Sequence, residues 1–318
     1  MGGCQPRANT PRLRIAIVPK MESNAYWDVL HAGAIQEERD LERGGAQVEL
    51  LWHGPANEGD LEEQIRLLRK LADERVNVII VSPQNSDLLI STIESIAEQG
   101  IPIITFDSRL NSSVVSSYVG TNNYDAGAKA ADHLAGILQG KGRVLLQRYV
   151  AGSDSSMERE AGFANRLHEK YPQIELLPWK TYCGTDRETA LQVCKQGLAQ
   201  FGGQAQAVMV STQFSGNEML RAMTDAKLAG KVPLVVFDTN PLLVSALKEG
   251  NVESLVVQSE MEIGRTAFET AYSRVMGKAV PRTIFTPVTI VTRENLNNPA
   301  IQDLIEPPFR QYLPAPAK

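Results

Sequence analysis

The chain has 318 residues, a formal net charge of −5, and a composition that is 43% hydrophobic and only 6% aromatic. This length exceeds one ordinary doubly wound domain and suits two, each with a sizeable core. No block of Lys or Arg favours nucleic acid or an anionic membrane surface, and no apolar run is long enough to span a bilayer. We therefore expect a water-soluble protein of two domains without a nucleic-acid partner.

The first twelve residues precede the first predicted strand and lack the hydrophobic core of a signal peptide. The run Gly2-Gly3-Cys4, followed by a polar spacer up to Pro11, resembles the processed start of a bacterial lipoprotein. Two interpretations stay open. Residues 1–12 are either an unstructured spacer with an incidental cysteine, or a lipid on Cys4 anchors the protein to a membrane without spanning it.

Short β-branched apolar runs alternate with segments of helical periodicity along the chain. In the N-terminal part, this pattern predicts strands at 13–18, 48–52, 78–81, 103–106 and 117–119 and helices at 26–43, 61–74 and 88–99. Farther along, it predicts helices at 126–138, 158–171, 187–201, 218–228, 242–249 and 263–276, strands at 144–149, 176–182, 207–210, 234–237 and 255–258, and a last extended stretch at 286–292. We expect residues 299–318 to form a Pro-rich tail without a core pattern.

Strands that are apolar almost throughout and are separated by helices are typical of parallel sheets covered on both faces. Because the strands are too many for one open sheet, we expect an α/β fold with two doubly wound parallel-sheet lobes. A (β/α)₈ barrel is the competing fold. The short strand at 117–119 has no helix directly before it, which breaks the regular repeat that a barrel requires.

Polar and aromatic side chains follow the predicted strands, where ligands bind in open parallel sheets. The candidate ligand-binding residues are Asn24, Tyr26, Trp27, Asp107, Arg109, Arg159, Thr212, Asp238 and Gln258. Aromatic rings suit the C–H faces of a sugar, and acids, amides and Arg suit its hydroxyls. Each residue alone also fits a core position or a helix cap. Their joint placement after successive strands favours a sugar-like ligand.

Signatures of catalysis are missing from the sequence. The four histidines show no HExxH spacing, and there is no GxSxG motif. The segment from Gly136 to Gly142 is one residue short of a phosphate loop and has Gly where Ser or Thr is needed. We therefore expect a binding protein with no cofactor and no metal. Cys183 and Cys194 form either a disulfide in an exported protein or two free thiols.

Several short motifs, in this order and spacing, resemble the ribose- and galactose-type periplasmic sugar-binding proteins. They are Tyr26-Trp27, Gly33, 101–107, 119–123, 126–127, 159–163 and 235–238. The resemblance runs from residue 13 to residue 291. This family shares its fold with the effector domains of LacI-type repressors.

The resemblance implies two lobes joined by three crossover strands, with a sugar in the cleft and an ABC permease or chemoreceptor that responds to hinge closure. The first lobe would be 13–121 plus 259–287, and the second 122–258 plus 288–298. It also implies roles: Asn24 would hydrogen-bond the sugar, Tyr26 and Trp27 would stack on it, Asp107 would bind hydroxyls from the first lobe, and Asp238 and Gln258 would bind them from the second lobe and hinge. A monomer that is periplasmic or extracytoplasmic is expected.

Some positions depart from the ribose-type pattern. Ser108 replaces an Arg, with Arg109 one residue late, Met157 replaces a second Arg, and Thr212-Gln213 replace Asn-Asp. These departures favour a larger or modified sugar, or another polyol, over ribose.

Other functions remain as alternatives to transport. A sensory protein for a chemoreceptor or kinase has the same sequence features. A LacI-type effector domain without its DNA-binding part is the other alternative, because residues 1–12 leave no room for a helix-turn-helix.

Overall fold

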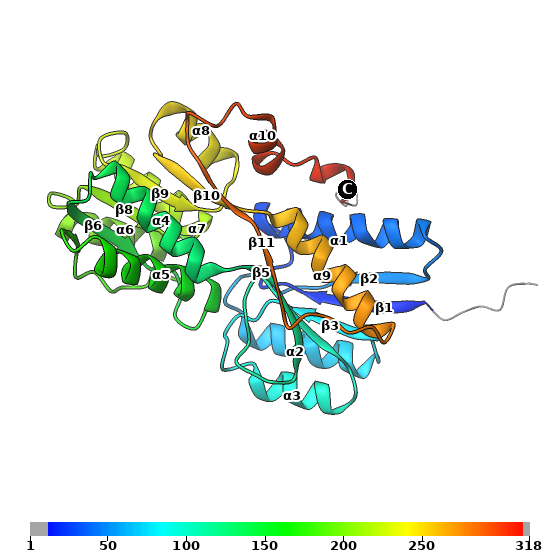
Figure 1. Cartoon of the computed structure of the whole chain (residues 1–318). Coiled ribbons are helices and arrows are strands. Elements are labelled where there is room, and N and C mark those ends of the chain that lie inside the picture. Colours follow the sequence, from blue (N-terminus) through cyan, green and yellow to red (C-terminus); the bar gives the residue numbers. More distant parts are fainter. Residues whose placement is uncertain (1–11, 314–318) are drawn as a thin grey trace, which may run out of the picture.

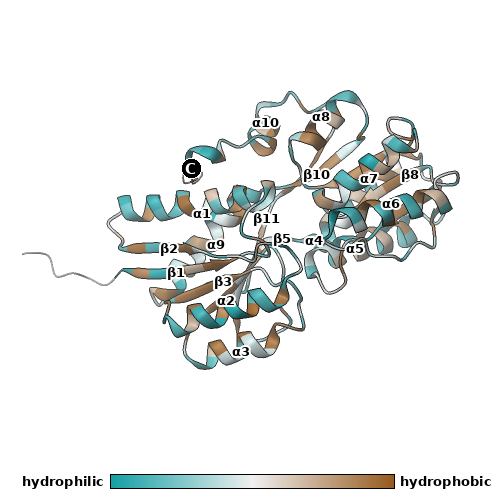
Figure 2. Ribbon diagram, turned by 180° about the vertical axis from the view of Figure 1, so that it is seen from behind, coloured by the Kyte–Doolittle hydropathy of each residue, from teal (hydrophilic) through white to brown (hydrophobic). Residues whose placement is uncertain are grey.

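The computed structural model describes residues 12–313, so Cys4 lies outside the described residues. Two α/β lobes lie side by side, each with a six-stranded sheet between two layers of helices (Figure 1). In both lobes the strands are mainly hydrophobic, whereas the helices mix hydrophobic and hydrophilic faces (Figure 2). Within residues 12–313, no helix is both long and apolar enough to cross a membrane.

The sheet of the first lobe is entirely parallel and has the order β11-β5-β4-β3-β1-β2. Its strands are β1 (Leu13–Val18), β2 (Val48–Trp52), β3 (Val78–Val81), β4 (Ile103–Phe106), β5 (Val115–Thr121) and β11 (Thr283–Thr286). Helices α1 (Ala25–Arg43) and α9 (Glu260–Val275) cover one face, and α2 (Leu61–Asp73) and α3 (Ile90–Glu98) the other (Figure 1). Ile15 and Ile17 of β1 face the first pair of helices, and Ala16 and Val18 the second, as strand alternation requires.

The sheet of the second lobe has the order β12-β10-β9-β8-β6-β7, and only β12 runs antiparallel to its neighbour. Its strands are β6 (Gly142–Gln147), β7 (Ile174–Leu176), β8 (Ala207–Val210), β9 (Leu234–Phe237), β10 (Ser254–Gln258) and β12 (Val288–Val291). Helices α4 (Asn123–Ile137) and α5 (Asp154–Lys170) cover one face, and α6 (Arg187–Phe201), α7 (Gln213–Asp225) and α8 (Pro241–Glu249) the other.

In each lobe, one pair of helices makes an unusually close contact through glycine. A Cβ added to Gly33 of α1 would lie 2.0 Å from the Met261 carbonyl oxygen of α9. A Cβ added to Gly162 of α5 would lie 1.9 Å from the Tyr124 carbonyl oxygen of α4. Any side chain at these positions would push the two helix backbones apart.

Three crossings at the sheets connect the lobes, after β5, after β10 and between β11 and β12. The extended stretch predicted at 286–292 is in fact two strands, separated at Pro287. Because proline cannot donate a hydrogen bond to a ladder, it suits the point where the chain leaves one sheet for the other. Its carbonyl accepts from the Ser259 backbone N–H at 3.3 Å, which ties two of the crossings together.

The predicted tail at 299–318 differs most from the expectation. It contains α10 (Pro299–Ile305), whose Ile301 and Ile305 are buried in the core of the second lobe. The chain then reaches α1 of the first lobe through the 3₁₀ turn η1 (Phe309–Gln311), and Arg39 donates to the Tyr312 carbonyl at 3.1 Å. Residues 299–313, here named the C-terminal strap, therefore contact both lobes (Figure 1).

Both cysteines of the described range are free, buried thiols. Burial raises the pKa of Cys183 to about 12, so its thiol stays protonated at neutral pH.

Candidate functional site

A cavity of about 240 Å³ lies where the carboxyl ends of the two sheets face each other. The segments that follow β1, β2 and β4 line it from the first lobe, and the segments that follow β6, β7, β8 and β9 line it from the second. Its charged lining residues are Lys20, Glu58, Asp107, Arg159, Arg187 and Asp238.

Each lobe contributes one carboxylate to the cavity, from an Asp that directly follows a strand and has a left-handed backbone conformation. Asp107 directly follows β4 and has φ 61°, and Asp238 directly follows β9 and has φ 64°. Their backbone N–H groups donate to the carbonyls of the adjacent strand, from Asp107 to Val119 at 3.0 Å and from Asp238 to Val256 at 2.9 Å. A left-handed conformation costs an L-residue roughly 1–2 kcal/mol, and Asp tolerates it better than most. Such strain is typical of binding sites.

The Asp107 carboxylate is held by hydroxyls and an ammonium. Oδ1 accepts from the Tyr26 hydroxyl at 2.7 Å, and Oδ2 accepts from Ser82 at 2.7 Å and from Ser108 at 3.2 Å. The Lys20 ammonium lies 3.6 Å from Oδ2. Burial alone would raise the pKa of Asp107, but Lys20 and the Tyr26 hydroxyl lower that pKa below its usual value. Asp107 is therefore ionised at neutral pH.

The Asp238 carboxylate pairs with a guanidinium. Oδ2 lies 3.2 Å from Arg159 Nη1, and Oδ1 accepts from Gln258 Nε2 at 2.7 Å. Arg159 is itself fixed, because it also donates to Asn123 at 2.8 Å and to the Ser211 carbonyl at 2.9 Å. Burial raises the pKa of Asp238 above its usual value, although Arg159 opposes the shift.

Gln258 connects the two carboxylates through Tyr26. Its Nε2 donates to the Tyr26 hydroxyl at 3.2 Å as well as to Asp238, while the same hydroxyl donates to Asp107. Its Oε1 accepts from Thr121 at 2.6 Å. Gln258 is fully buried. It does not line the cavity, and it positions Tyr26 and Asp238, which do.

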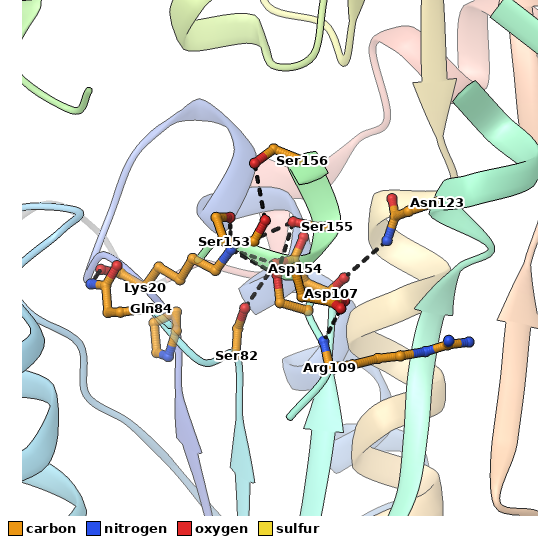
Figure 3. Close-up of polar contacts among 12 residues, drawn as sticks. Lys20, Ser82, Gln84, Asp107, Arg109, Asn123, Ser153, Asp154, Ser155 and Ser156 are labelled. Carbon is orange, nitrogen blue, oxygen red and sulfur yellow. Dashed lines mark hydrogen bonds and ion pairs between the residues drawn. The ribbon is translucent and has the colours of Figure 1, made fainter. Parts of the chain in front are cut away.

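Lys20 was missed in the sequence analysis, although it lies only two residues after β1. Its ammonium donates to Ser108 of the first lobe at 2.7 Å. It also donates to Ser153 of the second lobe at 3.0 Å (Figure 3). The Ser108 and Ser155 hydroxyl oxygens lie 2.8 Å apart, and the Arg109 backbone N–H donates to Asp154 at 3.0 Å. These bonds join the lobes directly, so the structure has a closed cleft.

Most of the predicted site residues line the cavity: Asn24, Tyr26, Trp27, Asp107, Arg159, Thr212 and Asp238. Arg109 points elsewhere, and its guanidinium lies over the ring of Tyr118 at 4.7 Å. The Asn24 side-chain oxygen caps α1 and accepts from two backbone N–H groups at 2.9 Å, and its amide nitrogen donates to the Met21 sulfur at 3.6 Å. Trp27 is only 2% exposed and lies in the core of the first lobe.

The second lobe and a loop add residues that the sequence analysis did not single out. Tyr149, shortly after β6, packs near Phe214 of α7, with ring centroids 5.9 Å apart. Glu58 follows β2, and burial raises its pKa, although Lys20 and a hydrogen bond with Tyr149 oppose the shift. Among residues 12–313, no group of three or more His, Cys, Asp or Glu side chains could hold a metal ion.

The family described as periplasmic binding protein domain matches residues 15–279. The chain is 27% identical to the ribose import binding protein of Bacillus subtilis over 239 residues, 74% of this chain and 75% of the relative. It is 25% identical to the xylitol-binding protein of Mycolicibacterium smegmatis over 250 residues, 79% of this chain and 70% of the relative. A carbohydrate transporter solute binding protein from Agrobacterium radiobacter, solved in complex with D-arabinose, superposes with a TM-score of 0.85 at 27% identity, covering 92% of this chain and 99% of that one. The chain therefore belongs to the periplasmic binding protein family.

Proposed function

We propose that this chain is an extracytoplasmic receptor that binds one sugar or polyol molecule in its interlobe cleft and delivers it to an ABC importer. Family membership supports a receptor without enzymatic activity. Relatives named for ribose and xylitol, and a similar structure that holds D-arabinose, support the ligand class. The observation that carries the proposal is that Asp107 and Asp238 line one small cavity from opposite lobes, beside Tyr26.

The size of the cavity favours a single sugar ring. Its volume of about 240 Å³ corresponds to roughly eight water molecules at their density in the liquid. A disaccharide would require the lobes to open and the bonds from Lys20 to Ser153 to break. We therefore expect a monosaccharide or a polyol of similar length.

The charges in the cavity favour a neutral ligand. Lys20 lies next to Asp107, Arg159 pairs with Asp238, and Arg187 lies 3.3 Å from Glu218. A sugar phosphate or sugar acid would have to compete with these carboxylates for the cations, which is costly in a buried site. The lone pairs of Asp107 and Asp238 that remain free suit ligand hydroxyls, which donate to them.

The second lobe supports a ligand other than ribose. Met157, which replaces an expected Arg, is 41% exposed, and its sulfur contacts the Gly152 N–H at 3.1 Å. The Thr212 hydroxyl contacts the Ser215 N–H at 3.2 Å as the cap of α7. The aromatic rings of Tyr149 and Phe214 line the cavity from the second lobe and favour a ligand with a larger C–H face.

We also propose that Cys4 carries a lipid that holds the receptor at the membrane near its importer, and that the protein is a monomer. Metabolic labelling with a fatty acid, followed by mass spectrometry of the N-terminal peptide, tests the lipid. An unmodified Cys4 in the native membrane fraction would contradict it.

A thermal-unfolding screen tests the proposed function. The set should contain pentoses, hexoses and pentitols, each with its acid and phosphate derivative. We expect a neutral sugar or polyol to stabilise the protein by about 2.7 kcal/mol at a hundred times its Kd. Stabilisation by phosphorylated or acidic sugars alone, or by none of the compounds, would contradict the proposal.

A further inference from the structure

A second cavity, of about 1170 Å³, lies under the C-terminal strap. Its walls come from the N-terminal half of α1, from Trp52 at the end of β2, from the start of α8 and from the strap. It shares no lining residue with the cavity of the interlobe cleft. Figure 1 shows the strap passing from α10 over α1.

Two buried polar atoms at this cavity lack a hydrogen-bond partner among the described residues, Glu260 Oε1 and Thr239 Oγ1. Glu260 is 6% exposed and begins α9, and Thr239 is 7% exposed and follows Asp238. A buried polar atom without a partner is unfavourable, so a group that donates hydrogen bonds to both would be stabilised here.

The charges around the cavity favour a cationic donor. The described lining residues include four acids, Glu22, Asp28, Glu260 and Glu306, but only one guanidinium, that of Arg310. Burial raises the pKa of Glu260 well above its usual value, and an ammonium group beside this buried side chain would favour its ionised form. Burial lowers the pKa of His31 to about 4, so this side chain is neutral where it stacks on Trp52, with ring centroids 4.2 Å apart.

Ser23, Asn240 and Gln311 also line the cavity, but much of the remaining wall is apolar and includes Val29, Pro241, Val244 and Leu304. Such walls suit methylene groups, whereas a sugar would leave its hydroxyls unpaired against them. A ligand with an aliphatic body and one or two ammonium ends matches both parts of the cavity, because Glu22, Asp28 and Glu306 line it besides Glu260.

We propose that this cavity is a second binding site, specific for a small aliphatic amine. The ammonium group donates to Glu260 and Thr239, and the carbon chain lies against Val244 and Leu304. The site is independent of the sugar proposed for the interlobe cleft.

Isothermal titration of the full chain with putrescine tests the proposal, with 1,4-butanediol as the neutral control of equal chain length. We expect putrescine to bind and to raise the Tm, and butanediol to do neither. Glu260→Gln keeps the size of the side chain but cannot form the carboxylate that pairs with the ammonium, so it should weaken putrescine binding at least about tenfold. Absence of heat with millimolar putrescine, or equal binding of butanediol, would overturn the proposal.

Two further variants keep the test decisive if Glu260→Gln does not fold. Glu306→Gln, on the C-terminal strap, should weaken putrescine binding about twofold to fivefold, because the lost charge is exposed and already lies 4.0 Å from the Lys248 ammonium. Asp107→Asn, in the cleft, should leave putrescine binding as it is. Loss of binding in Asp107→Asn together with full binding in Glu306→Gln would place the amine in the cleft and refute the second site.

Discussion

Asp107 in the first lobe and Asp238 in the second occupy equivalent positions, each directly after a buried strand and each with a positive φ. Their partners differ. Asp107 accepts hydrogen bonds from hydroxyls and lies beside the Lys20 ammonium, and its pKa is lowered. Asp238 pairs with Arg159, but burial raises its pKa. The comparison shows that the backbone places the carboxylate at the cleft, while the neighbouring side chains decide how strongly its charge is stabilised.

Removing either carboxylate should give the largest effects, and the effects on stability should differ between the two lobes. Asp107→Ala and Asp238→Ala should each weaken ligand binding at least about a hundredfold, because ligand hydroxyls lose a charged acceptor. Both variants should also lower the free energy of unfolding, by up to about 3–5 kcal/mol, since each leaves a buried cation, Lys20 or Arg159, without its carboxylate. The loss should be larger for Asp107→Ala, because the lowered pKa of Asp107 shows that its charge is the better stabilised of the two. Titration calorimetry and urea unfolding measure the two effects. Equal loss of stability in both variants would contradict the asymmetry.

The second lobe should also show a pH dependence of stability through Glu160. Its Oε1 accepts from the Tyr149 N–H at 3.0 Å and from Ser211 at 2.9 Å, and burial raises its pKa from 4.5 to about 7. The folded protein thus keeps a proton that the unfolded chain releases. The contribution of this proton to stability is complete below the unfolded-state pKa of 4.5, and it is lost as the pH rises through the folded-state pKa of about 7.

The free energy of unfolding should therefore fall by up to about 1.4 kcal/mol per pH unit between about pH 5 and pH 7. Glu160→Gln should flatten this slope, because the amide cannot release a proton. Urea unfolding across this range measures it. A slope that is equally steep in the variant would show that other groups cause it.

The glycine contacts test whether both lobes depend on close helix packing. Gly33→Ala and Gly162→Ala should each destabilise the protein by about 1–3 kcal/mol, because the added methyl group meets a helix backbone. Gly136→Ala, also in a helix but with open space around its Cβ, should be stabilising by about 0.5–1 kcal/mol. Thermal unfolding compares the three variants. A similar Tm for all of them would contradict the packing argument.

Lys20 should give the smallest effect of the set. Lys20→Met keeps the length of the side chain but removes its bonds to Ser108 and Ser153, so ligand affinity should fall about tenfold and the lobes should open more in the free protein. Small-angle scattering measures the opening. Lys129→Met, an exposed position on α4, serves as the control. Unchanged scattering and affinity in Lys20→Met would rule out its role between the lobes.

Much of the fold could be predicted because its signals are local. The alternation of apolar runs and helical periodicity predicted the two doubly wound lobes, and the comparisons confirm the α/β fold and the family. The split at Pro287 was not predicted, because periodicity identifies an extended segment but not the sheet that it joins. The strap was missed because Ile301 and Ile305 are buried by contacts distant in sequence.

The site could be predicted in part. Tyr26, Asp107, Arg159 and Asp238 line the cavity because strand ends fix where they lie. Arg109 does not line the cavity. It lies one position after Ser108, and its side chain is directed toward Tyr118. Residues on loops, such as Glu58, carry no periodic signal.

A crystal structure of the protein with the sugar or polyol identified by the screen tests the central claim most directly. The account predicts one ligand molecule between the lobes, with its hydroxyls within hydrogen-bond distance of both Asp107 and Asp238. A ligand that contacts neither carboxylate, or that lies only beneath the C-terminal strap, would contradict it.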